Sequence, residues 1–177
     1  MNATLHVPDG TVGAFARAVA SDLILTEAHE LDSRNWAAWL ALYSVDAKFW
    51  MPAWLDENAQ SDDPNTQVSL IYHESRLELE ERVDRVNSLK SITTMPLPRT
   101  IHVIGGIRLL AHSEDRIQAS SSANVHVYDP RTSDHHIAAV RYSHTLSRTG
   151  DGPWLITCKT ISLINDRMPS VVDFYTV

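Results

Sequence analysis

The chain has 177 residues, of which 44% are hydrophobic and 21% charged, with a formal net charge of −7. This composition predicts one globular domain, and the acidic balance argues against a nucleic-acid partner, since phosphate binding needs a basic surface. No apolar run approaches the roughly 20 residues of a membrane span, the first residues lack a signal-peptide pattern, and the single cysteine, Cys158, cannot form an internal disulfide. We therefore expect a cytoplasmic protein.

The chain begins with a segment, residues 1–10, that we expect to be a flexible arm ahead of one α+β domain over residues 11–177. Residues 11–31 read as a helix because their apolar residues recur at helical spacing, although the stripe drifts around the axis. The members of this stripe are Val12, Phe15, Ala16, Val19, Leu23, Ala28 and Leu31.

A tryptophan-rich segment, residues 27–52, contains three of the five tryptophans. Asp32 or Ser33 is the expected cap of a second helix, because a short side-chain oxygen can accept from a free amide of the first turn. The large residues that follow at i, i+3, i+4 and i+7 share one helical face. They are Trp36, Trp39, Leu40 and Tyr43. Residues 48–51 read as a strand that Pro52 ends or bends.

The remainder of the chain predicts one more helix and a set of strands. Residues 53–66 form a loop, 67–74 a strand, and 75–88 a helix with a capping-box spacing between Ser75 and Glu78. That helix has its apolar contacts at Leu77, Leu79, Val83 and Val86. Residues 89–99 form an irregular connection, and strands follow at 100–110, 117–128, 135–147 and 154–164. Long antiparallel strands after a helical block indicate an α+β fold, with a strongly curved, mostly antiparallel sheet wrapped around the first helices.

Nine histidines raise the possibility of a metal site. His135 and His136 are adjacent on a strand and point to opposite faces, and His136 and His144 lie about 26 Å apart along one face. A cross-strand pair of His126 with a residue near His136 stays open, but ordinary polar histidines are the expectation. One cysteine cannot supply a Rieske cluster, which needs two cysteines and two histidines.

Residues with catalytic chemistry are few. Tyr43, Asp46, Tyr72 and His73 could converge in a cone-shaped cavity as acid and base; alternatively, Asp46 caps a turn and the tyrosines fill the core. Cys158 lies in a strand and is expected to be a small apolar filler. Gly105 and Gly106 lie inside a strand pattern and predict a bulge.

Several stretches then occur together in one order. They are LD followed by WAAWLALYSVDAKFWMP, then QVSLIYHESRLELEERVDRV, then PLPRTIHVI, then KTISLINDRMPSVVDFYTV. In this combination the chain resembles the small (β) subunit of aromatic-ring-hydroxylating dioxygenases, in the branch that acts on aromatic acids such as benzoate or anthranilate. The resemblance implies the nuclear-transport-factor-two-like cone, a curved sheet enclosing helices, shared with scytalone dehydratase and ketosteroid isomerase.

The resemblance also implies a mainly structural role. The partner α subunit would hold the Rieske 2Fe–2S cluster and the mononuclear Fe(II), a separate reductase would deliver electrons from NADH, and the β subunit would form a trimer within an α3β3 assembly. No catalytic, cofactor-binding or metal-binding residue is expected in this chain. The candidate subunit contacts are Arg99, His102, Asp166, Arg167, Asp173, Phe174 and Tyr175. The apolar C-terminal segment is expected to be tied down on the domain's own sheet or against a neighbour.

Two other functions stay open at this point. The first is a stand-alone lyase or isomerase, with Asp46 or His73 as base and Tyr43 or Tyr72 as oxyanion donor. The second is a small-molecule binding module without chemistry.

Overall fold

The computed structural model describes residues 10–88 and 96–177, so the expected arm over residues 1–10 lies almost wholly outside the described residues. The helices are α1 (Gly10–Asp32), α2 (Trp36–Ala41) and α3 (Arg76–Asn87). The strands are β1 (Tyr43–Pro52), β2 (Ser69–His73), β3 (Arg99–His112), β4 (Arg116–Asp129), β5 (Asp134–Ser147) and β6 (Leu155–Leu163). Within these ranges no helix is long and apolar enough to cross a membrane.

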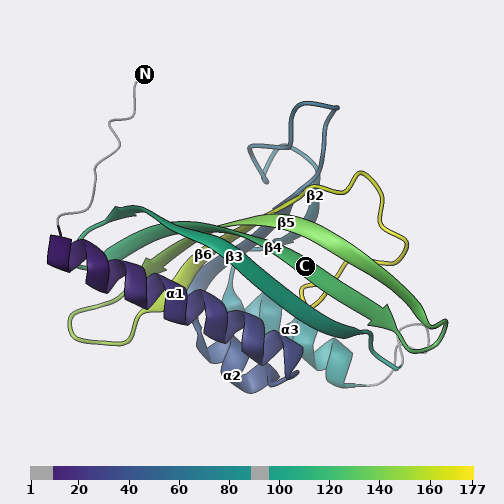
Figure 1. The fold of residues 1–177 in the computed structure, drawn as a ribbon, viewed down its shortest axis with the longest axis horizontal. Coiled ribbons are helices and arrows are strands. Elements are labelled where there is room, and N and C mark those ends of the chain that lie inside the picture. The colour runs from purple at the N-terminus through teal and green to yellow at the C-terminus, as the bar shows by residue number, and fades with distance from the viewer. Residues whose placement is uncertain (1–9, 89–95) are drawn as a thin grey trace.

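The strands form one sheet in the order β2-β1-β6-β5-β4-β3, and the helices gather on one side of it (Figure 1). Strands β3 to β6 are joined as consecutive antiparallel hairpins, as the turn signals predict. The remaining pairings are the antiparallel β1–β2 pair and the parallel β1–β6 pair, which joins the first strand to the last. The predicted α+β fold with helices enclosed by a mostly antiparallel sheet is therefore confirmed.

The inner face of the sheet is built from alternating residues, as a strand buried on one side requires. In β4 the alternation is complete over its centre, where Ile117, Ala119, Ala123, Val125 and Val127 are buried. The predicted bulge is also present: the β3–β4 register shifts between Gly105 and Arg108, and Gly106 has a φ of +62°. A positive φ is the backbone conformation that glycine adopts without steric cost.

Helix α1 packs against β3 and β4, but its buried stripe differs from the prediction. Val12 and Phe15 are 59% and 56% exposed, whereas Ala20 and Ile24 are buried. The predicted stripe was wrong at its N-terminal end because the sequence pattern drifts around the axis, so it did not identify the side that faces the sheet.

Helix α2 is shorter than predicted and begins differently. Neither Asp32 nor Ser33 caps it: Asn35 occupies the N-cap position and makes no side-chain cap hydrogen bond. The helix ends at Ala41, and Tyr43 is the first residue of β1, paired with Ile156 of β6. Strand β1 therefore starts five residues before the predicted Lys48, because pairing with β6 outweighs the helical spacing of Tyr43.

Helix α3 matches the predicted range within one residue at each end. Its predicted capping box is not formed, because the Glu78 contact goes to the residue before the N-cap Ser75. The Ser75 hydroxyl makes no cap hydrogen bond, while the Glu78 carboxylate accepts from the Glu74 backbone N–H at 2.9 Å. Leu79 and Val83 are buried as predicted, but Leu77 is 61% exposed.

Candidate functional site

A buried polar cluster lies between α1 and the sheet, centred on Glu27. The Glu27 carboxylate accepts hydrogen bonds from the Tyr43 hydroxyl and, at 2.8 Å, from the Lys159 ammonium. His144 Nε2 lies 3.3 Å from its second oxygen. Glu27, His144 and Lys159 are at most 2% exposed, so this cluster (Glu27, Tyr43, His144 and Lys159) is closed to solvent. Helix α1, β1, β5 and β6 each contribute one member, so the cluster ties four elements together.

The charges within this cluster fix its protonation. Burial by itself would raise the pKa of Glu27, but the Lys159 charge and the hydrogen bonds from His144 and Lys159 hold that pKa well below its ordinary value. Burial and the neighbouring Glu27 carboxylate raise the pKa of Tyr43 well above 10. Burial lowers the pKa of His144, more than the contact with Glu27 raises it. At neutral pH the cluster is thus an ion pair flanked by a neutral phenol and a neutral imidazole.

Two aromatic rings complete the surroundings of Lys159. Its ammonium nitrogen lies 4.4 Å from the ring centroid of Tyr142 and 5.7 Å from that of Phe49. A cation over an aromatic face is stabilised by the ring quadrupole, more strongly where water is excluded. The carboxylate of Glu27 and the two rings therefore hold the Lys159 ammonium in place, away from any substrate.

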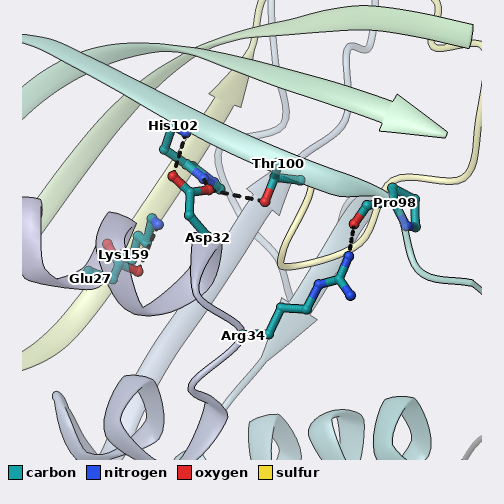
Figure 2. A network of polar contacts seen from close by, with 7 residues as sticks. All are labelled: Glu27, Asp32, Arg34, Pro98, Thr100, His102 and Lys159. Carbon is teal, nitrogen blue, oxygen red and sulfur yellow. Dashed lines mark hydrogen bonds and ion pairs between the residues drawn. The ribbon is translucent and has the colours of Figure 1, made fainter. Parts of the chain in front are cut away.

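A second polar group joins the end of α1 to β3 (Figure 2). Asp32 accepts from the His102 backbone N–H at 2.9 Å, from the Thr100 hydroxyl at 3.0 Å, and from His102 Nδ1 at 2.6 Å. Burial by itself would raise the pKa of Asp32, but the contacts with His102 outweigh it and the pKa lies below its ordinary value. Asp32 therefore fixes a tertiary contact instead of capping the second helix.

Arg34 extends this contact to the segment before β3. Its guanidinium donates to the carbonyl oxygens of Leu97 at 3.0 Å and Pro98 at 2.8 Å. Arg34 has a φ of +55°, a left-handed conformation that is costly for a residue with a side chain. The two hydrogen bonds help to offset that cost.

The Asp32–His102 pair has the carboxylate–imidazole arrangement of an oriented base, with Nδ1 facing the carboxylate and Nε2 pointing away from it. The His102 side chain is only 1% exposed, however, and its Nε2 has no hydrogen-bond partner among the described residues. A substrate cannot reach a nitrogen enclosed in this way, so the pair serves to hold β3 against α1.

The C-terminal segment is held on the subunit's own helices. The Phe174 ring stacks on Trp39 with centroids 4.8 Å apart and meets the edge of Trp36 at 5.4 Å. Asp173 accepts two hydrogen bonds from the Arg82 guanidinium, at 3.0 and 2.9 Å. The expectation that this segment is tied down holds, with α2 and α3 as its anchors in place of the sheet.

The candidate subunit-contact residues fall into two groups. Arg99, Asp166 and Arg167 are exposed. The others are buried within the subunit: His102, Asp173, Phe174 and Tyr175. Only the exposed residues can offer a large side-chain surface to a partner. The buried residues fix the position of the segments to which they belong.

The four residues considered for catalysis are not brought into one group. Tyr43 is buried and donates to Glu27, whereas Asp46 is exposed and accepts from the Ser44 hydroxyl at 2.8 Å. On β2, Tyr72 contacts Glu74 at 3.1 Å and His73 contacts Glu78 at 3.5 Å. Each side chain has a separate partner, so the geometry does not support a shared acid–base site.

The sequence analysis missed Glu27, His144 and Lys159. Glu27 lies four residues after Leu23 and four before Leu31, on the buried stripe of α1, and Lys159 alternates with Ile161 and Leu163 on the inner face of β6. An acidic residue on one apolar stripe and a basic residue on another is a readable signal of a buried ion pair.

No group of three or more histidine, cysteine, aspartate or glutamate side chains placed to hold a metal is found over residues 10–88 and 96–177. Cys158 is half-buried on β6 with a free thiol.

Comparison with known proteins decides the family. A profile described as ring hydroxylating beta subunit matches residues 26–170. The chain belongs to the ring-hydroxylating β-subunit family. It is 38% identical to toluate 1,2-dioxygenase subunit beta of Pseudomonas putida over 156 residues, which are 88% of this chain and 94% of that protein. These matches confirm the family that the sequence motifs suggested.

The solved structures agree. The β subunit of benzoate 1,2-dioxygenase from Burkholderia mallei superposes with a TM-score of 0.72 and 28% identity, covering 89% of this chain and 94% of that one. A nuclear-transport-factor-two-like protein from Novosphingobium aromaticivorans superposes with a TM-score of 0.59 and 14% identity, covering 87% and 85%. The second likeness concerns the fold alone and confirms the predicted cone.

Proposed function

We propose that this chain is the non-catalytic scaffold of a terminal oxygenase that dihydroxylates an aromatic carboxylate. The observation that carries the proposal is the family match over residues 26–170, together with 38% identity to a toluate dioxygenase β subunit across nearly its whole length. Toluate and benzoate are both aromatic carboxylates, which favours the same class of substrate here.

In this proposal the redox chemistry belongs to a partner. An α subunit carries the Rieske cluster and the mononuclear Fe(II), a separate reductase passes electrons from NADH, and three β subunits assemble with three α subunits in the cytoplasm. The closed state of the Glu27 cluster supports this division of labour, since its members are paired with one another and sealed from solvent. The surface, not the interior, is then where the subunit acts.

The edge strand β3 is our candidate for a partner contact. It is one end of the sheet, and Ile101 and Val103 on its outer face are 62% and 52% exposed. A long unpaired edge with outward apolar residues is a hazard for a free subunit and is usually covered. Arg99 begins the same strand, and its guanidinium lies 5.9 Å from the ring centroid of Tyr128.

Reconstitution tests the proposed role. The full chain should be purified alone and together with its α subunit, and oxygen consumption with benzoate should be followed in the presence of the reductase and NADH. Turnover is expected only when the α subunit is present. A chain that stays monomeric and converts a small molecule by itself would contradict the scaffold role and favour a lyase or isomerase.

A charge placed on the edge strand tests the surface. Ile101→Lys should reduce the yield of the mixed α and β assembly, because burying a lysine at an apolar contact is costly. Leu77→Lys is the matched control, since Leu77 is 61% exposed on α3 against 62% for Ile101. Light scattering after size-exclusion chromatography measures both. Equal assembly of the two variants would rule out β3 as the contact.

A further inference from the structure

Two histidines meet on the outer face of the sheet, opposite the helices. His126 of β4 pairs in register with Ile137, and His135 of β5 pairs with Tyr128, so the two imidazoles are diagonal neighbours on one face. His126 Nδ1 lies 3.1 Å from His135 Nε2. Their ring centroids are 5.2 Å apart and the ring planes differ by 13°. The backbone register therefore places two imidazole nitrogens side by side at a solvent-facing position.

We propose that His126 and His135 bind a divalent transition-metal ion between them. At a metal–nitrogen distance of about 2.0–2.1 Å, two nitrogens on one tetrahedral or octahedral ion lie about 2.9–3.4 Å apart. The observed 3.1 Å falls within this interval. Because adjacent strands of a sheet hold both histidines, little chain entropy is lost when the ion binds.

Without metal, the facing nitrogens lie at hydrogen-bonding distance, where an N–H of one ring donates to the lone pair of the other. Metal binding requires that proton to move to the other nitrogen of its ring, a change of tautomer that frees both facing lone pairs. Both rings lie on the outer face, so small side-chain rotations can then direct both lone pairs at the ion. No covalent bond of the chain is broken.

The ligand set selects the class of ion. Imidazole suits Zn²⁺, Ni²⁺ and Cu²⁺, whereas Mg²⁺ and Ca²⁺ prefer oxygen ligands. Among the described residues no third protein ligand joins the pair, so water fills the remaining positions. Asp134 lines a hollow that also includes His135, and its negative charge favours a cation nearby, whereas Asp129 in the same hollow is ion-paired with Arg131.

Titration of the untagged full-length chain with Ni²⁺ tests the site. Isothermal titration calorimetry should show one ion per chain, and paramagnetic Ni²⁺ should broaden the imidazole resonances of His126 and His135 before those of other histidines. His126→Gln and His135→Gln should each weaken binding at least tenfold, because one imidazole alone is a poor chelate.

His29→Gln is the matched control, because His29 is exposed on α1. It should leave the affinity unchanged, and circular dichroism should show that all three variants fold. If Ni²⁺ binds the His126 and His135 variants as tightly as the parent chain, or broadens other histidines first, the site is disproved. Neither result bears on the scaffold role, which reconstitution with the α subunit tests separately.

Discussion

Helix α1 is fixed to the sheet at two places that differ in depth. At Glu27 a charge is sealed in the interior and neutralised by Lys159, whereas at Asp32 a carboxylate at the helix end accepts hydrogen bonds from β3. The Glu27 side chain is 3% exposed and the Asp32 side chain 24%. Water can partly replace a lost partner at Asp32 but cannot do so at Glu27. Removing one partner should therefore cost more in the interior than at the helix end.

Removal of the buried cation should have the largest effect. Lys159→Met leaves Glu27 charged and unpaired in the interior, and breaking a buried pair in this way costs about 3–5 kcal/mol of unfolding free energy. Urea unfolding at a fixed protein concentration measures the change.

Two further variants separate charge from packing at this position. Lys48→Met, on an exposed lysine of β1, should change the unfolding free energy by no more than about 0.5 kcal/mol. Glu27→Gln combined with Lys159→Met should recover part of the loss, because no unpaired charge then remains. If the double variant is as unstable as Lys159→Met alone, packing and not charge explains the loss.

Removal of the helix-end carboxylate should have a smaller effect. Asp32→Ala deletes the acceptor for His102 and Thr100, and hydrogen bonds to a charged group are worth about 1.5–3 kcal/mol. Asp22→Ala, on an exposed residue of the same helix, is the control. Unfolding midpoints that shift equally for the two variants would contradict a role for Asp32 in holding β3.

The buried His144 should also make the unfolding free energy depend on pH. Because burial lowers the pKa of His144 in the folded protein, the unfolded chain binds a proton there as the pH falls below 6.5 and the folded chain does not. Stability is then present above pH 6.5 and falls with decreasing pH, by about 1.4 kcal/mol per pH unit for one proton. Urea unfolding between pH 7.5 and 5.5 should show this slope.

His144→Gln should remove most of the slope, since glutamine does not titrate. Glu27, Lys159 and Tyr142 face His144. The pKa of Glu27 is lowered and that of Tyr142 is raised, so both shifts lead away from this pH range. A residual slope is expected from His73 and His136, whose pKa values burial also lowers. An unchanged slope would show that His144 takes up no proton when the protein unfolds.

The smallest effect is expected at Arg34. Arg34→Ala removes two hydrogen bonds to carbonyls near the surface and should cost about 1 kcal/mol. Arg34→Gly loses the same bonds but suits the φ of +55°, so it should be the less destabilised of the two. Thermal unfolding of both variants measures the difference, and a glycine variant less stable than the alanine variant would contradict strain at this turn.

The sequence predicted the strands better than the contacts of the helices. Alternation of apolar residues and clear turn signals placed β3 to β6 within two residues, because both signals are local. Tyr43 was assigned to a helix because its pairing with Ile156, more than 100 residues away, leaves no trace in the local pattern. Asp32 was one of two candidate caps, with Ser33, for the same reason, since its partners lie on β3.

The candidate site was less predictable still. The resemblance identified the family, but the pairing of Glu27 with Lys159 depends on the way in which α1 packs against the sheet. The contact between His126 and His135 depends on the β4–β5 register, which sequence spacing alone left open. Periodicity assigns a residue to a face; only tertiary structure decides which residue it meets there.

The parallel pairing of β1 with β6 has a consequence for biosynthesis. Among the described residues, β6 alone connects the β1–β2 hairpin to the other three strands, and it leaves the ribosome after all of them. Until β6 emerges, the early hairpin has no neighbour in the sheet and its edges stay unpaired, a state in which chains tend to aggregate. Closure of the sheet, and any docking that requires a finished sheet, must therefore wait until β6 has been synthesised.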